Sequence, residues 1–124
     1  MKKRILIVDD EQELVKALQI RLGAAGYEVI VAYDGKKGLE KAQEGKPNLI
    51  LLDILMPEMD GFETLEKLKQ DRQTKTIPVI ILTAKSQLED VTRTTNLGAE
   101  NYIVKPFDYI AMMEKIKKAL RLEA

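Results

Sequence analysis

The sequence predicts an α/β fold, built on a single doubly wound parallel sheet of five strands with helices on both faces. Short apolar runs rich in β-branched residues alternate with charged segments whose apolar residues recur at helical spacing. Three of the runs are apolar throughout, which is typical of strands covered on both faces of a parallel sheet. Right-handed crossovers between parallel strands then place helices on both sides of the sheet.

Five strands and five helices are expected to alternate along the chain. The strands are the runs ILIV at 5–8, EVIVA at 28–32, NLILL at 48–52, PVIIL at 78–82 and NYIV at 101–104. The helices are expected near residues 11–25, 35–45, 61–71, 87–97 and 108–121. The first helix places Leu14, Leu18, Leu22 and Ala25 on one stripe, and the last places Ile110, Met113, Ile116 and Leu120 on another.

Helix boundaries carry residues with a clear local role. Asp34, Asp60 and Asp108 stand at expected helix starts, where a carboxylate accepts hydrogen bonds from free backbone amides. Gly26 and Gly98 suit left-handed positions after helices. The pair Asp60-Gly61 is interpreted as a turn and a helix start, without a chemical role.

Composition limits the possible functions. The 124 residues fit one compact domain, 1–124, and twenty Lys and Arg balance twenty Asp and Glu. No global charge therefore attracts nucleic acid or an anionic membrane. The chain has neither Cys nor His, which excludes thiol chemistry, imidazole general bases and Cys/His zinc sites. No apolar stretch approaches the roughly 18 residues of a membrane helix, so we expect a soluble, cytoplasmic protein.

Polar residues follow four of the expected strands at their carboxyl ends. Asp9 and Asp10 follow the first strand, Asp53 the third, Thr83 the fourth and Lys105 the fifth. In open parallel sheets, ligands bind outside the carboxyl ends of the strands, where the strand order reverses. The sequence therefore predicts that three carboxylates, a hydroxyl and an amine meet at one edge of the sheet.

This set of groups points to a metal ion and a phosphate. Three neighbouring carboxylates repel one another and need compensating positive charge, and oxygen-only ligands suit a hard ion such as Mg²⁺. Lys105 can pair with one phosphoryl oxygen while the Thr83 hydroxyl donates to another. Asp53 lies between them, and aspartate is a known nucleophile in phosphoryl transfer.

Four separated motifs also carry a family resemblance. They are Asp9-Asp10-Glu11, Asp53-Ile-Leu-Met-Pro-Glu-Met-Asp-Gly61, Thr83-Ala84 and Lys105-Pro106-Phe107. With these motifs, the chain resembles the bacterial two-component response-regulator receiver domains of the chemotaxis-regulator-like kind, over nearly all residues from 3 to 121. The resemblance implies a flavodoxin-like three-layer α/β/α fold with strand order 2-1-3-4-5.

The resemblance implies a phosphoacceptor and a metal site. Asp53 matches the phosphoacceptor of the family. Asp10 matches the direct Mg²⁺ ligand, and Asp9 matches an acidic neighbour that acts through water. Asp53 and the backbone carbonyl of Leu55 complete the implied metal ligands, with Mg²⁺ as the cofactor.

The resemblance also implies residues that respond to phosphorylation. Thr83 and Lys105 match the two residues that grip the phosphoryl group. Tyr102 matches an aromatic switch, whose ring moves inward as Thr83 turns toward the phosphate. The Lys105-Pro106 bond matches a peptide that is cis in the family.

The leading hypothesis is a phosphorylation-dependent signalling switch. Asp53 accepts a phosphoryl group from a sensor histidine kinase or phosphotransfer protein, for which the first helix is the expected docking site. The modification repacks the face of the fourth helix, fifth strand and fifth helix, which then controls a downstream protein or fused output domain. The chain is not expected to be a conventional enzyme. Self-phosphorylation from small donors with Mg²⁺ and slow self-dephosphorylation are the only reactions expected.

Other interpretations of the same residues remain open. Asp10 and Glu13 have capping-box spacing, so Asp10 could simply cap the first helix. Thr83 could be an ordinary strand residue, Lys105 a solvated lysine and Tyr102 a permanently packed strand aromatic. A phosphorylation-independent, receiver-like protein-binding module is the alternative function.

Two further classes fit the sequence poorly. Phosphatases and dehalogenase-like hydrolases carry a second Asp two residues after the nucleophile, and here Leu55 stands at that position. A nucleotide- or flavin-binding module would need a glycine-rich phosphate loop after the first strand, and none follows.

The expected output face bears on the oligomeric state. Regulators that dimerise through charge pairs on this face usually have paired aspartates where Glu100 and Asn101 stand, and commonly glutamate at Ala111. Lys115 and Lys117 remain basic, but their acidic partners are partly missing. We therefore expect a monomer when unphosphorylated, with no nucleic-acid binding by this chain.

Overall fold

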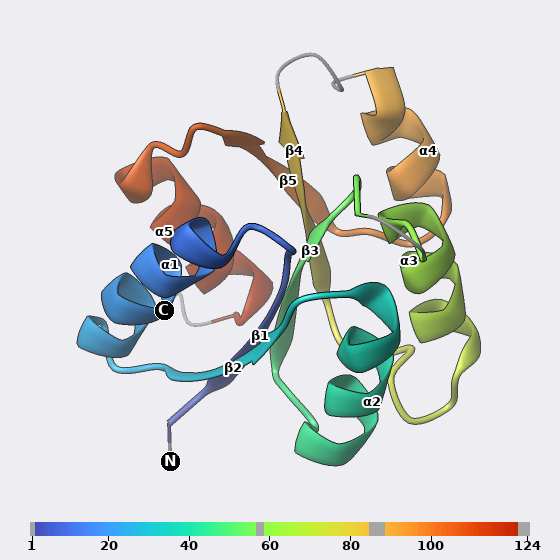
Figure 1. The fold of residues 1–124 in the computed structure, drawn as a ribbon, viewed down its shortest axis with the longest axis horizontal. Coiled ribbons are helices and arrows are strands. Elements are labelled where there is room, and N and C mark those ends of the chain that lie inside the picture. Colours follow the sequence, from blue (N-terminus) through green and yellow to red (C-terminus); the bar gives the residue numbers. More distant parts are fainter. Residues whose placement is uncertain (1, 57–58, 85–88, 122–124) are drawn as a thin grey trace.

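The computed structural model describes residues 2–56, 59–84 and 89–121. The strands are β1 (Arg4–Val8), β2 (Glu28–Ala32), β3 (Leu49–Asp53), β4 (Val79–Ala84) and β5 (Asn101–Lys105). The helices are α1 (Gln12–Ala24), α2 (Gly35–Gly45), α3 (Gly61–Gln70), α4 (Val91–Asn96) and α5 (Tyr109–Ala119). The expected alternation of strands and helices is confirmed (Figure 1).

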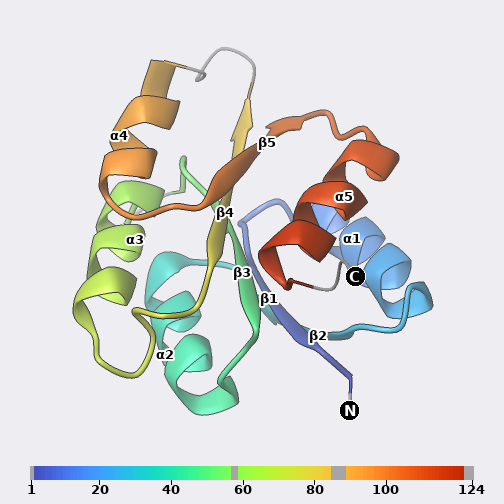
Figure 2. The same ribbon diagram turned by 180° about the vertical axis from the view of Figure 1, so that it is seen from behind.

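One parallel sheet runs through the centre of the molecule in the order β2-β1-β3-β4-β5. Helices α1 and α5 cover one face, and α2, α3 and α4 cover the other (Figures 1 and 2). The predicted doubly wound architecture and strand order are therefore confirmed. The order reverses between β1 and β3, whose carboxyl ends carry Asp9 and Asp53.

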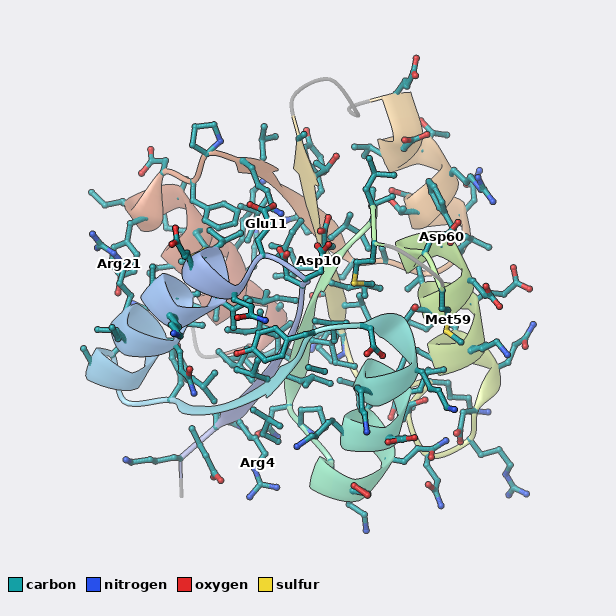
Figure 3. All side chains as sticks on the ribbon, viewed as in Figure 1. Arg4, Asp10, Glu11, Arg21, Met59 and Asp60 are labelled. Atoms are coloured by element: carbon teal, nitrogen blue, oxygen red, sulfur yellow. The ribbon has the colours of Figure 1, made fainter. Side chains whose placement is uncertain are left out.

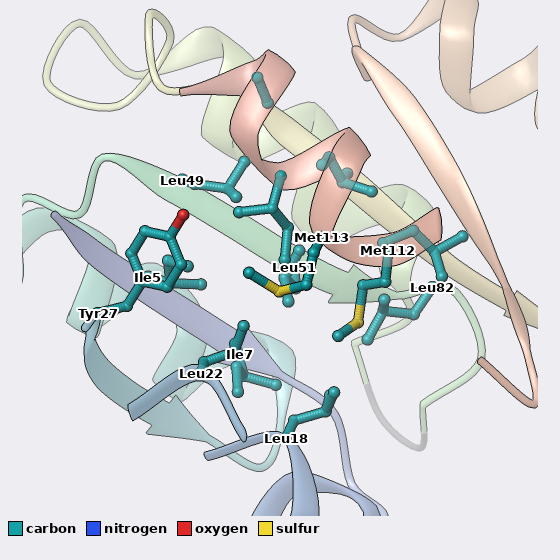
Figure 4. Close-up of a cluster of buried hydrophobic side chains, with 14 of the residues drawn as sticks. Ile5, Ile7, Leu18, Leu22, Tyr27, Leu49, Leu51, Leu82, Met112 and Met113 are labelled. Carbon is teal, nitrogen blue, oxygen red and sulfur yellow. The ribbon is translucent and has the colours of Figure 1, made fainter. Parts of the chain in front are cut away.

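Alternate residues of the central strands build two separate cores. Ile5 and Ile7 of β1 pack toward α1 and α5, where Figure 4 shows Ile5 beside Tyr27 and Ile7 beside Leu22. Their neighbours Leu6 and Val8 pack toward α2 and α3. Each fully buried Leu or Ile stabilises the fold by roughly 1.5–3 kcal/mol. This two-sided burial explains why the central strands are continuously apolar in sequence.

The expected helix signals are largely found in the structure. Asp34, Asp60 and Asp108 each accept a backbone hydrogen bond at a helix start, with distances of 2.8, 2.9 and 3.0 Å. Gly26 and Gly98 adopt φ angles of 97° and 108°, as expected. The glycine conformation at these two positions lets the chain turn after α1 and α4 without a Cβ clash.

Asp10 does not cap α1. The residue that precedes this helix is Glu11, and within the described residues no side chain caps the helix start. The interpretation of Asp10 as a helix cap is therefore wrong. Its carboxylate lies at the edge of the sheet where a metal ion is expected from the sequence.

Two expected inward-facing residues are exposed. Met112, Met113, Ile116 and Ala119 of α5 and the following Leu120 are buried, whereas the Ile110 side chain is exposed. Met112 and Ala119 belong to the apolar stripe and move its centre around the helix, away from Ile110. Ala25 is exposed because α1 ends at Ala24, which leaves Ala25 outside the stripe.

Three strands extend further toward their carboxyl ends than expected. β3 continues to Asp53, β4 to Ala84 and β5 to Lys105, because each of these residues still pairs with a neighbouring strand.

Helix α4 is shorter than expected. It covers only Val91–Asn96, and residues 87 and 88 of its expected range lie outside the described residues. Val and Thr dominate α4, and β-branched residues are weak helix formers. No described helix is long and apolar enough to cross a membrane.

Candidate functional site

Asp9, Asp10, Asp53 and Lys105 meet at the carboxyl edge of the sheet, whereas Thr83 and Tyr102 do not line the depression found there. Carboxylate oxygens of Asp9, Asp10 and Asp53 all lie within 4.8 Å of one another. Beside them is an open depression of about 300 Å³, lined by Asp10, Glu11, Asp53, Leu55, Ala84 and Lys105. Figure 3 shows Asp10 and Glu11 at the end of β1. The convergence of residues that are far apart in sequence follows from the parallel sheet.

Asp53 is a buried carboxylate at the last position of β3. Its Oδ1 accepts a hydrogen bond of 3.3 Å from the Leu55 backbone amide, and its Oδ2 lies 3.6 Å from Lys105 Nζ. Burial, followed by the charge of Asp9, raises the pKa of Asp53 to about 7, although Lys105 and the Leu55 amide act in the opposite direction. A bound cation would lower this pKa and favour the ionised form.

Lys105 holds the carboxylates together from β5. Its Nζ lies 2.7 Å from Glu11 Oε1 and 2.9 Å from Asp9 Oδ2. Burial acts to lower the pKa of Lys105, but the hydrogen bond to Glu11 and the close contact with Asp9 outweigh burial and raise the pKa above its ordinary value. Lys105 is therefore an ammonium ion that faces an excess of negative charge. The peptide bond to Pro106 is cis, as expected.

The acidic pair that follows β1 combines one buried and one exposed carboxylate. Asp9 is fully buried, and its Oδ1 accepts a hydrogen bond of 2.9 Å from the Glu11 amide. Its Oδ2 has no hydrogen bond of regular geometry among the described residues and depends on the ion pair with Lys105. Asp10 is exposed and lines the depression. This set of oxygen donors fits Mg²⁺, which takes few protein ligands and keeps several waters.

A family model shows what kind of domain this is. The model described as response regulator receiver domain matches residues 5–117, from β1 into α5. This chain belongs to the response regulator receiver domain family. The receiver domain is a regulatory domain of two-component signalling systems, so the predicted resemblance is confirmed and a conventional enzyme is not indicated.

Relatives of this receiver domain are regulators about twice its length. It is 42% identical over 121 residues to the alkaline phosphatase synthesis transcriptional regulatory protein PhoP of Bacillus subtilis, covering 98% of this chain and 50% of PhoP. It is 45% identical over 118 residues to the response regulator ArlR of Staphylococcus saprophyticus, covering 95% of this chain and 52% of ArlR. The chain thus spans about half the length of these curated relatives.

Solved structures agree with the fold. The CheY-like response regulator receiver domain protein from Methanospirillum hungatei superposes with a TM-score of 0.90 at 38% identity, covering 98% of this chain and 95% of that one. The chemotaxis protein CheY4 of Vibrio cholerae also gives a TM-score of 0.90, at 31% identity, covering 96% of this chain and 99% of that one. The flavodoxin-like arrangement expected from the sequence is therefore confirmed.

Thr83 and Tyr102 of the receiver domain lie on the same face of the sheet. Thr83 pairs with Val104, and Tyr102 is two residues before Val104 on β5. The buried Thr83 hydroxyl donates to the Ala84 carbonyl oxygen at 3.2 Å. No hydrogen bond between Thr83 and Asp53 is found in the described part of the chain. The grip of Thr83 on a phosphoryl group therefore stays a prediction.

The Tyr102 ring is partly buried and held from α5. Lys115 Nζ donates to the Tyr102 backbone carbonyl at 2.6 Å and lies 4.6 Å from the centroid of the ring. The ring packs against the core beneath α3 and α4. Movement of this ring is a prediction that a single conformation does not test.

Two positioning residues of the receiver domain were not assigned such roles from the sequence. A Cβ on Gly61 would lie 2.4 Å from the Asp53 carbonyl oxygen, and the Gly61 amide donates to the Ile54 carbonyl at 2.7 Å. Gly61 therefore lets α3 press against the backbone that presents Asp53. The second is Glu11, which binds Lys105. Both residues stand inside the recognised motifs, but neither spacing nor residue type shows the contact.

Proposed function

We propose that this receiver domain is a phosphorylation-dependent signalling switch that accepts a phosphoryl group on Asp53 with Mg²⁺. The observation that carries the proposal is the pairing of a buried Asp53 carboxylate with Lys105, beside two further aspartates. A carboxylate buried among like charges is a costly structural choice. That cost is accounted for if the site exists to bind a cation and an anionic phosphoryl group together.

The proposed transfer uses groups that the fold already brings together. An ionised Asp53 oxygen attacks the phosphorus of a phosphohistidine on the donor protein. The new P–O bond forms as the P–N bond breaks, and the leaving imidazole keeps the bonding electrons and takes up a proton. Lys105 neutralises charge on the phosphoryl oxygens. Mg²⁺, held by Asp9, Asp10, Asp53 and the Leu55 backbone carbonyl, would neutralise the remaining charge.

The response to phosphorylation begins at Thr83. Its hydroxyl exchanges the long bond to Ala84 for a stronger, charge-assisted bond to a phosphoryl oxygen. The movement of Thr83 opens space on the face where Tyr102 lies, and the ring of Tyr102 turns inward. The face of α4, β5 and α5 then changes shape, which shifts the population between two states.

The proposed partners are proteins. A sensor histidine kinase or phosphotransfer protein docks at α1, and the face of α4, β5 and α5 controls a downstream protein or a fused output domain. The relative PhoP is named as a transcriptional regulatory protein, which supports an output domain that acts on transcription. We propose that residues 1–124 form one domain that acts in the cytoplasm. The domain is a monomer until it is phosphorylated, and it does not itself bind nucleic acid.

The test is the intact mass of the chain after incubation with acetyl phosphate. One phosphoryl adduct is expected with Mg²⁺, and none is expected with EDTA or in Asp53→Asn. Hydrolysis of the adduct is expected to be slow because Leu55, at the position where hydrolases place an acid, carries no proton donor. If the folded chain forms no adduct and beryllofluoride with Mg²⁺ also fails to bind, the phosphorylation-independent binding module replaces this proposal.

A further inference from the structure

Glu11 makes the shortest ion pair at the site, although it is not one of the expected metal or phosphate ligands. Its Oε1 accepts a hydrogen bond of 2.7 Å from Lys105 Nζ, across 94 positions of sequence. The two residues join the start of α1 to the end of β5. Both line the depression beside Asp53. Figure 3 shows Glu11 next to Asp10 on the same edge of the sheet.

The backbone holds Glu11 in place for this contact. Its amide donates to Asp9 Oδ1 at 2.9 Å, and its carbonyl accepts from the Val15 amide at 3.0 Å. The side chain does not cap α1, so within the described residues the contact with Lys105 is its one recorded polar interaction. Replacing the carboxylate should therefore leave the start of α1 intact.

The Lys105 ammonium lies closer to Glu11 than to Asp53. Its Nζ is 2.7 Å from Glu11 Oε1, 2.9 Å from Asp9 Oδ2 and 3.6 Å from Asp53 Oδ2, and within the described residues its one regular hydrogen bond goes to Glu11. To approach a phosphoryl group on Asp53, the ammonium must loosen one of its two shorter contacts. The Asp9 side chain is fully buried, so water cannot take the place of Lys105 there. The Glu11 side chain is 59% exposed, and water can replace Lys105 there at little cost.

We propose that Glu11 competes with the phosphoryl group for Lys105 and so lowers the affinity of the site for a phosphoryl-like anion. Glu11 is a positioning residue, which acts through Lys105 and does not touch the phosphoryl group. In the resting state, Glu11 holds the Lys105 ammonium beside Asp9. On phosphorylation, Lys105 moves away and the Glu11 side chain is released to solvent. This inference rests on the proposed function, because it concerns the same site.

The test compares two single variants, each of which removes one negative charge at the start of α1. Glu11→Gln removes the carboxylate that binds Lys105. Glu13→Gln removes an exposed first-turn carboxylate for which no ion pair is found among the described residues. Calorimetric titration with beryllofluoride at saturating Mg²⁺ should show binding about three- to tenfold tighter in Glu11→Gln, and changed less than about twofold in Glu13→Gln. Equal changes in the two variants, or no change in either, overturn the proposal.

A second measurement separates competition from a general charge effect. The Glu11→Gln substitution is repeated in a Lys105→Met background, with Mg²⁺ affinity titrated separately. If Glu11 acts through Lys105, the gain in affinity disappears in this background. A gain that persists in Lys105→Met means that Glu11 acts by charge alone, and the inference is wrong. Wild-type protein that binds no beryllofluoride overturns the proposed function instead, whereas a normal wild-type response with no Glu11 effect overturns only this inference.

Discussion

The two ends of the same parallel sheet treat charge in opposite ways. At the amino end, Arg4 binds the Asn48 side chain through its backbone amide at 2.7 Å and lies 3.3 Å from Glu28. Its guanidinium also donates to the Gly45 carbonyl. At the carboxyl end, Lys105 is the single cation among Asp9, Asp10, Glu11 and Asp53 in the described lining.

The difference indicates which end carries function. The amino end balances the partly exposed cation Arg4 against the exposed anion Glu28, and such surface pairs contribute about 0–1 kcal/mol. The carboxyl end buries Asp9 and Asp53 at a cost, and its charge is unbalanced. Such an unbalanced cluster costs stability, which is consistent with the proposed site for a cation and a phosphoryl group. Five variants or conditions test this contrast.

The largest expected effect comes from the glycine that supports the carboxyl end. Gly61→Ala places a Cβ about 2.4 Å from the Asp53 carbonyl oxygen and from Ile54 Cα. We expect a loss of about 3 kcal/mol or more in the free energy of unfolding, measured by urea denaturation. Gly23→Ala is the control, because nothing lies within 4 Å of its added Cβ. Its helix position predicts a gain of about 0.5–1 kcal/mol, and a similar loss in both variants would contradict the packing argument.

Asp53→Asn should stabilise the metal-free protein at pH 8. The substitution removes a buried charge that Asp9 and Asp10 repel, and it keeps the shape of the side chain. The expected gain is about 1–4 kcal/mol in the free energy of unfolding, from urea denaturation in EDTA. Glu28→Asn, at the amino end, is the comparison. If Asp53→Asn is destabilising, the cluster contributes to folding, and the contrast between the two ends fails.

The pH dependence of stability should show the same imbalance. The folded-state pKa of Asp53 is about 7, against an ordinary value of 3.8, so the folded protein binds more protons than the unfolded chain between these values. The contribution of Asp53 to the free energy of unfolding is therefore fully present below pH 3.8 and is lost as the pH rises to about 7. The difference in unfolding free energy between wild type and Asp53→Asn should therefore widen over this window and level off above it.

Mg²⁺ should offset the destabilisation that ionised Asp53 causes at high pH. Because Mg²⁺ binds only the folded protein, we expect it to raise the melting temperature of the wild type at pH 8. The rise should be smaller at pH 5, where Asp53 is protonated. Asp53→Asn should respond less at pH 8. Differential scanning calorimetry measures both shifts, and equal shifts at the two pH values would rule out Asp53 as a ligand.

The smallest effect belongs to the amino end. Glu28→Gln removes the exposed partner of Arg4 and should cost about 0.5 kcal/mol, further reduced in salt. Beryllofluoride affinity should not change, because the substitution lies at the far end of the sheet. A loss above about 2 kcal/mol would show that this end depends on charge as strongly as the carboxyl end does.

Most of the fold was predictable because it depends on local patterns. Continuous apolar runs, helical periodicity and the caps Asp34, Asp60 and Asp108 are read along the chain, and the structure contains all of them. The boundaries were less accurate. The residue at which β3 ends depends on its pairing with β4, and the exposure of Ile110 depends on which side of α5 meets the sheet.

The sequence by itself determined the residue types of the site and the edge at which they meet. Asp9, Asp10, Asp53, Thr83 and Lys105 stand at strand ends, and a parallel sheet brings strand ends together for any such sequence. Only the tertiary structure decided the pairings. Glu11 reaches Lys105, Gly61 abuts the Asp53 backbone, and Lys115 holds Tyr102, because distances of a few ångströms between distant segments arise from packing. Burial likewise sets the raised pKa of Asp53, since desolvation exists only once the chain has folded around the carboxylate.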